Sequence, residues 1–195
     1  MTGTRRGGYT ERNGLSRGWT AEGSPSLSTS FARSSSRTSN VARVKRDVIS
    51  VDTNILLPAV ETSNAVHGRA AAFLESLEGR EDVALSEFVL LELYVLLRNP
   101  AVLIRPLGAA AAAEVCEAFR HHPTWQVVGF PGASRAFHDR FWPRLRDDDF
   151  ARRRAFDWRV ALSLLMQGVD EFATVNEKDF SDFGFVRVWN PINDA

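Results

Sequence analysis

Short apolar runs alternate with longer segments of helical periodicity from about residue 47 to the end of the chain. The first run, Val48-Ile-Ser-Val51, meets the polar triplet Asp52-Thr-Asn54 and resumes as Ile55-Leu-Leu57. A run this apolar is typical of a strand buried on both faces, as in the parallel sheet of an α/β domain. We therefore interpret it as the first strand, with Asp52 near its carboxyl end, where ligands bind in open α/β sheets. Taken alone, Asp52 is equally well explained as a residue that caps a helix or begins a turn.

Later segments continue the alternation. Further apolar runs predict strands at residues 83–85, 125–128, 172–174 and 186–189, and helical periodicity predicts helices at about 65–77, 87–98, 106–121, 132–146 and 150–167. Ser86 is the expected N-cap of the second helix, and Gly168 is the expected C-cap of the fifth. Strands that alternate with helices imply right-handed β-α-β units and a mostly parallel sheet, so the predicted fold class is α/β.

Residues 1–46 differ from the rest of the chain in composition. They are rich in Gly, Ser, Thr and Arg and, together with Asp47, carry a net charge of +6, which leaves −6 for the remaining residues. Such a segment cannot bury enough apolar surface to offset the entropy of ordering it, so we expect a disordered basic tail and one domain at 47–195. A transit peptide, a start codon assigned too far upstream, and a basic arm that contacts nucleic acid are the alternatives. A dispensable tail predicts that limited proteolysis removes it without lowering the melting temperature.

Cysteine content and hydropathy indicate the compartment. The single cysteine, Cys116, excludes an internal disulfide and suits a reducing environment. No apolar run approaches the ~18 residues that a membrane span requires. We therefore expect a soluble, cytoplasmic protein without a membrane partner.

Glu92 falls at an apolar position of a predicted helix. Phe88 lies four positions before it and Leu96 four positions after it, so helical spacing puts the carboxylate within an apolar stripe. Burial of a carboxylate is costly unless a partner, usually a cation, compensates it. The sequence therefore predicts that Glu92 is buried and meets a cation.

Two further sites repeat the pattern less sharply. Asp157 precedes apolar positions of its helix, and a salt bridge to Arg153 or Arg154, one turn earlier, is the structural alternative. Polar groups also gather after the fourth strand, in the segment Thr174-Val-Asn-Glu-Lys-Asp-Phe180. Turn formation and helix capping are the alternative there.

Carboxylates from strand ends and from helices are expected to converge on one crevice. An all-oxygen cluster of this kind suits Mg²⁺ or Mn²⁺. These ions catalyse phosphodiester hydrolysis by generating a hydroxide nucleophile and stabilising the attacking and leaving oxygens, so no base residue is required. The sequence contains no glycine-rich phosphate loop, no Gly-x-Ser-x-Gly elbow and no His-Glu-x-x-His zinc motif. Metal-dependent hydrolysis is therefore the chemistry that these residues favour.

Four motifs occur in order along the chain: Val51-Asp-Thr-Asn-Ile-Leu56, Ser86-Glu-Phe-Val-Leu-Leu-Glu-Leu93, the helix around Asp157, and Thr174-x-Asn-x-x-Asp-Phe180. Their order and spacing resemble the motifs of PIN domains, and in particular those of the VapC toxins of bacterial toxin–antitoxin pairs. The resemblance covers about residues 48–191. It implies a three-layer α/β/α sandwich with a mostly parallel central sheet and the activity of a metal-dependent endoribonuclease.

The same resemblance suggests a role for each polar residue of the motifs. Asp52, Glu92 and Asp157 would be catalytic acids, and Asp52 and Asp157 would bind the Mg²⁺ or Mn²⁺ ion. Many PIN domains have an acid where this chain has Asn176. Asp179 is then the available fourth carboxylate. The departure at Asn176 bears on the binding of a second metal ion more than on the binding of the first. The supporting polar groups would be Asn54, Thr174 and Asn176.

Partners follow from the resemblance as well. It implies an RNA substrate and a cognate antitoxin that inserts a segment at the acidic site. Most homo-oligomers are two-fold dimers, so a homodimer is the default expectation. Phe137, Phe141 and Trp142 are candidate interface residues, with packing into the core as the alternative. A non-catalytic PIN-like module that binds RNA or a protein is the alternative function.

Overall fold

The computed structural model describes residues 47–193, so the predicted tail at 1–46 lies outside the described residues, as do 194 and 195. Within residues 47–193, none of the helices is both long and apolar enough to cross a membrane. The elements, in chain order, are β1 (Val48–Val51), α1 (Thr53–Val60), α2 (His67–Leu77), β2 (Ala84–Ser86), α3 (Glu87–Leu97), α4 (Ala109–Arg120), β3 (Gln126–Val128), α5 (Ser134–Arg144), α6 (Arg154–Leu165), β4 (Val169–Ala173), α7 (Glu177–Phe180) and β5 (Arg187–Trp189).

The strands pair in parallel throughout the described domain. β1 pairs with β4 and β4 with β5, while β2 pairs with β3. A single parallel bridge between Ile49 and Val83 joins the two groups, so the strand order is β3-β2-β1-β4-β5. The predicted parallel sheet is confirmed.

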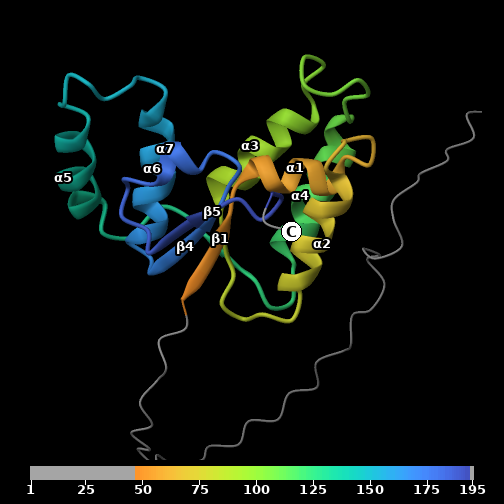
Figure 1. Ribbon diagram of the computed structural model, residues 1–195, viewed down its shortest axis with the longest axis horizontal. Helices are drawn as coiled ribbons and strands as arrows, with labels where there is room; N and C mark the ends of the chain where they lie inside the picture. The colour runs from red at the N-terminus through yellow and green to blue at the C-terminus, as the bar shows by residue number, and fades with distance from the viewer. Residues whose placement is uncertain (1–46, 194–195) are drawn as a thin grey trace, which may run out of the picture. The chain divides into compact units, whose positions relative to one another are not determined.

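Helices cover both faces of this sheet (Figure 1). One buried cluster packs α1, α2, α3 and α4 against β1 and β2, and the other packs α5, α6 and α7 against β4. Apolar burial on both sides is what a parallel sheet requires, because its strands have no face for solvent. The three-layer α/β/α sandwich expected from the resemblance is therefore present.

The first strand ends at Val51, so Asp52 follows its carboxyl end as predicted. Helix α1, which the sequence did not predict, begins at Thr53 and contains the apolar residues up to Leu57. Asp52 is the N-cap of α1, and its carboxylate accepts a hydrogen bond from the backbone N–H of Thr53 at 2.7 Å. Short apolar runs do not distinguish a buried strand from a buried helix, and Ile55 is buried completely in the helical conformation. The capping interpretation of Asp52 is thus correct for its local structure.

Other boundaries shift for local reasons. Ser86 caps α3 as predicted, since its hydroxyl accepts a hydrogen bond from the Phe88 N–H at 3.2 Å. The Ala-rich helix was predicted to begin at Pro106 but begins at Ala109, after the N-cap Gly108. The sequence did not predict α7, where turn formation and helix capping were the structural alternative to a site role.

The candidate interface aromatics of α5 divide between the core and the surface. Phe137 and Phe141 are only 1% and 8% exposed, and their rings stack with a centroid separation of 5.4 Å. The prediction that they lie at an interface is wrong, because residues four apart share the helix face that packs onto α6. Trp142, one position further, turns outward and is 54% exposed.

Gly168 supplies a testable element of the fold. Its φ of +82° lies in the left-handed region, and a methyl group added there would meet no atom within 4 Å. Gly79 has equally open space without that conformation. Both Gly→Ala changes reduce the freedom of the unfolded chain similarly. We expect Gly168→Ala to be less stable than Gly79→Ala by about 1–2 kcal/mol, measured by urea denaturation. Equal stabilities would contradict the conformational requirement.

Candidate active site

Three polar residues meet at the carboxyl edge of the sheet. Asp52 follows β1, and Thr174 follows its parallel neighbour β4. The Thr174 hydroxyl donates to Oδ2 of Asp52 at 2.6 Å, and the Asn54 amide donates to the same oxygen at 2.8 Å. The carbonyl oxygen of that amide accepts a hydrogen bond from the Val175 N–H at 3.0 Å. The structure therefore brings the predicted Asp52, Asn54 and Thr174 into one network.

Glu92 approaches this network from α3. Its Oε2 accepts a hydrogen bond from the hydroxyl of Thr53 at 2.7 Å. The prediction that Glu92 is buried is wrong, since the residue is exposed and Val95, three positions later, is 54% exposed. The buried face of α3 is formed instead by Val89, Leu90, Leu93 and Leu97. Glu92 thus lies at the open rim of the site rather than beneath it.

Thr53 is a site residue that the sequence did not single out. It is only 2% exposed, and its hydroxyl lies 3.3 Å from the Val89 carbonyl oxygen as well as 2.7 Å from Glu92. In the sequence, only its position between Asp52 and Asn54 could have indicated that Thr53 belongs to the site. The contact that gives it a role joins residues 39 positions apart, so it could be seen only in the folded chain.

Asp157 faces the other acids from α6. Burial raises the pKa of its carboxyl first, and the charges of Asp179 and Glu92 raise it further, while Arg154 opposes them. Arg154 itself is engaged elsewhere, because its guanidinium pairs with Asp182 and donates to the backbone oxygen of Asp179 at 2.8 Å. Within the described residues, Asp157 forms no salt bridge to Arg153 or Arg154. The structural alternative for Asp157, a salt bridge one helical turn away, is therefore not found there.

Beyond Thr174, the last motif contributes through its backbone and one charge. The Asn176 N–H donates to the Thr174 hydroxyl at 3.0 Å, whereas the Asn176 side chain is exposed and makes no capping hydrogen bond to α7. Asp179 is exposed on α7, and its charge acts on Asp157. Beyond Thr174, it is therefore Asp179, rather than the Asn176 amide, whose side chain acts on the other acids.

The electrostatics of Asp52 are dominated by desolvation. Burial raises its pKa to about 6 from an ordinary value of 3.8, the hydrogen bond from Thr174 opposes that shift, and the charges of Glu92 and Asp157 add to it. Carboxylates held together with this balance favour a cation. No three His, Cys, Asp or Glu side chains of the described residues are arranged closely enough to enclose a metal ion by themselves. The donors are all oxygens, which fits an ion that uses one or two carboxylates and keeps several waters.

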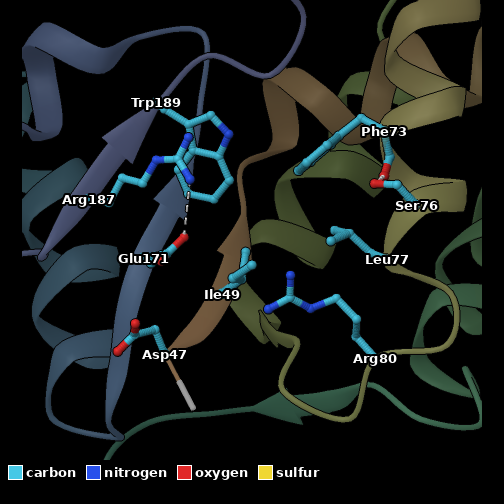
Figure 2. A pocket seen from close by; sticks show the side chains of 9 residues that line it. All are labelled: Asp47, Ile49, Phe73, Ser76, Leu77, Arg80, Glu171, Arg187 and Trp189. Atoms are coloured by element: carbon cyan, nitrogen blue, oxygen red, sulfur yellow. Dashed lines mark hydrogen bonds and ion pairs between the residues drawn. The ribbon is translucent and has the colours of Figure 1, made fainter. Parts of the chain in front are cut away.

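A separate pocket of about 400 Å³ lies between α2 and the sheet (Figure 2). Ile49, Glu171 and Arg187 are register partners on adjacent strands and form its sheet side. Both arginines that line it have acidic partners: Arg80 pairs with Asp82 at 2.8 Å, and Arg187 lies 3.9 Å from Glu171. None of the predicted site residues lines this pocket.

The parallel five-strand order, the two helical layers and the acids at the carboxyl edge define a PIN-like domain. No family model matches the sequence. The fold is similar to VapC20 from Mycobacterium tuberculosis, a sarcin-ricin loop cleaving toxin, with a TM-score of 0.53 and 23% identity over 70% of this chain and 95% of that one. It is also similar to VapBC2 from Rickettsia felis, with a TM-score of 0.53 and 16% identity over 73% of this chain and 98% of that one.

A more similar relative places the chain within a family. Ribonuclease VapC24 from two strains of Mycobacterium tuberculosis is 49% identical over 145 residues, which are 74% of this chain and 97% of the relative. The chain therefore belongs to the VapC family of PIN-domain ribonucleases.

The raised pKa of Asp52 predicts a pH dependence of stability in the absence of metal. Between its ordinary pKa of 3.8 and its folded pKa of about 6, the folded chain keeps a proton that the unfolded chain has lost. The free energy of unfolding should therefore fall as pH rises through this range, by about 3 kcal/mol at most from this group. Asp52→Asn should flatten the fall, measured by urea denaturation in a chelator. The exposed-acid variant Glu114→Gln is the control, and identical pH profiles for Asp52→Asn and wild type would contradict the assignment.

Proposed function

We propose that this chain is a divalent-metal-dependent endoribonuclease and the toxin of a type II toxin–antitoxin pair. Two independent lines support the proposal: the 49% identity to a protein named as a ribonuclease, and the acids that converge on one edge of the sheet. The observation that carries it is Asp52. Its carboxylate is held by hydrogen bonds in a position where burial and neighbouring acids oppose its ionisation, and a bound cation would stabilise the ionised form there.

The donor set fits Mg²⁺ or Mn²⁺. Asp52 and Asp157 would hold the ion, while Glu92 and Asp179 would bind its waters or assist as further acids. When bound, the ion would supply a hydroxide nucleophile and stabilise charge on the phosphate oxygens. Ligation by few carboxylates agrees with the finding that no three acids of the described residues enclose an ion by themselves, since Mg²⁺ dehydrates reluctantly and keeps several waters.

The chain's own residues would orient these acids. Thr174 and Asn54 fix one oxygen of Asp52 through hydrogen bonds of 2.6 and 2.8 Å. Thr53 donates to Glu92 and so restricts an otherwise exposed side chain. Residues that position metal ligands in this way commonly change affinity or activity by about 10–100-fold when removed.

A cognate antitoxin is the proposed protein partner, and the cytoplasm is the proposed compartment. Exposed apolar residues on α3 support a protein contact beside the acids, since Leu91 is 61% and Val95 is 54% exposed. An apolar surface rimmed by polar groups is typical of an interaction site.

Self-association stays a prediction: light scattering at micromolar concentration should give a dimer mass, and a monomer mass would refute it.

The metal proposal predicts activity and a thermal response together. Wild-type protein should cleave single-stranded RNA with Mg²⁺ or Mn²⁺, and not with a chelator. Glu92→Gln should abolish cleavage and reduce the increase in melting temperature that Mn²⁺ provides, because a ligand stabilises only the state that it binds. Thr53→Val should lower the cleavage rate by about 10-fold, and Thr53→Ser, which keeps the hydroxyl, should lower it less.

Glu114→Gln, an exposed acid on α4, is the matched control and should leave both readouts unchanged. Wild-type protein that leaves RNA intact and melts at the same temperature with and without divalent ions would favour the non-catalytic binding module instead.

A further inference from the structure

Phe156 stands out on the surface of α6. It is 77% exposed, although it directly precedes Asp157 in the first turns of the helix. A single exposed aromatic residue is ordinary on a protein surface. The position of Phe156 directly beside a candidate catalytic acid is what makes it a candidate for substrate binding.

The same edge of the site contains a stacked pair. Arg159 lies three positions after Phe156, so both side chains share one side of α6. Its guanidinium lies 4.0 Å from the centroid of the Phe88 ring on α3. Phe88 in turn lies one helical turn before Glu92. The pair therefore connects the two helices that carry Asp157 and Glu92, and it places a planar cation at the rim between them.

Basic side chains adjoin Phe156 along the chain, in contrast to the acids inside the site. Arg152 and Arg153 are exposed and directly precede α6. A polyanionic chain that approaches the acids would be repelled by them unless cations nearby offset that field. The arginines around Phe156 supply such an offset at the point where an incoming strand reaches Asp157.

We propose that Phe156 is a stacking platform for an unpaired base of the RNA substrate, with the arginines of the α6 rim contacting the flanking phosphates. The inference rests on the proposed ribonuclease function and adds the residue that holds the substrate beside the acids. Aromatic faces combined with cations are the usual means of binding single-stranded nucleic acid, because every base has a π-face. The exposed apolar residues Leu91 and Val95 lie on α3, not on α6. Arg152, Arg153 and Arg159 are close to Phe156 along the chain, so its own helix fits RNA better than an apolar peptide.

The test measures how RNA affinity depends on the size, apolarity and aromaticity of the side chain at position 156. Affinity is measured by fluorescence anisotropy with a short labelled single-stranded RNA in a chelator, so that cleavage is stopped. Phe156→Ala and Phe156→Leu should each bind about 5- to 100-fold more weakly than wild type, and Phe156→Trp should bind about as well. In cleavage assays with metal, the loss should appear mainly in KM. Trp142→Ala, which removes an exposed aromatic on α5, is the matched control and should bind normally.

The remaining outcomes identify what fails. Full affinity in Phe156→Ala, with RNA cleavage by wild type intact, overturns the stacking role and leaves the ribonuclease proposal standing. Near wild-type affinity in Phe156→Leu also overturns it, since an apolar contact would then suffice. A Phe156→Ala variant that binds RNA normally but binds its antitoxin weakly would make this residue part of a protein interface. A wild-type chain that neither binds nor cleaves RNA overturns the proposed function and this inference with it.

Discussion

The hydrogen bond of 2.6 Å from the Thr174 hydroxyl to Asp52 joins the two strand ends on which the acidic edge depends. Parallel pairing of β1 with β4 brings the residues that follow both strands to the same edge of the sheet. The hydroxyl then fixes one carboxylate oxygen, while the other oxygen caps α1 through the Thr53 N–H. Asp52 therefore has two roles at once, because the group that begins the first helix is also the group that a cation would meet.

These contacts hold the carboxylate against an opposing field. The hydrogen bonds from Thr174 and Thr53 lower the pKa of Asp52, whereas burial, Glu92 and Asp157 raise it, and the net result is a pKa of about 6. The upward effects are thus larger than the downward ones. A fold selected for stability alone would not keep ionisable groups in that balance, since an uncompensated buried charge is strongly unfavourable. The arrangement is physically sensible for a site that is completed by a cation.

The sequence predicted the strands and helices α2 to α6 in the right order, because short apolar runs alternate with longer segments of helical periodicity. It did not predict α1, because a short apolar segment such as the one around Ile55 is compatible with either a buried strand or a buried helix. The resemblance named the acids that the fold brings together, but not their exposure. Glu92 was predicted to be buried because its helical neighbours are apolar, and α3 instead buries a different face. Thr53 was missed because its partner is remote in sequence.

Helix α6 shows how an acidic site can still attract a polyanion. Successive helical residues turn by about 100°, so one helix presents opposite charges to different surroundings. Asp157 faces the acids, Arg154 is occupied by Asp182, and Arg159 lies over Phe88. A divalent ion bound by the acids would offset part of their negative charge without changing the arginines. Under the proposed function, metal binding and the approach of RNA would therefore be coupled through charge, because the ion that would supply the nucleophile would also let the basic side chains of α6 act on the RNA.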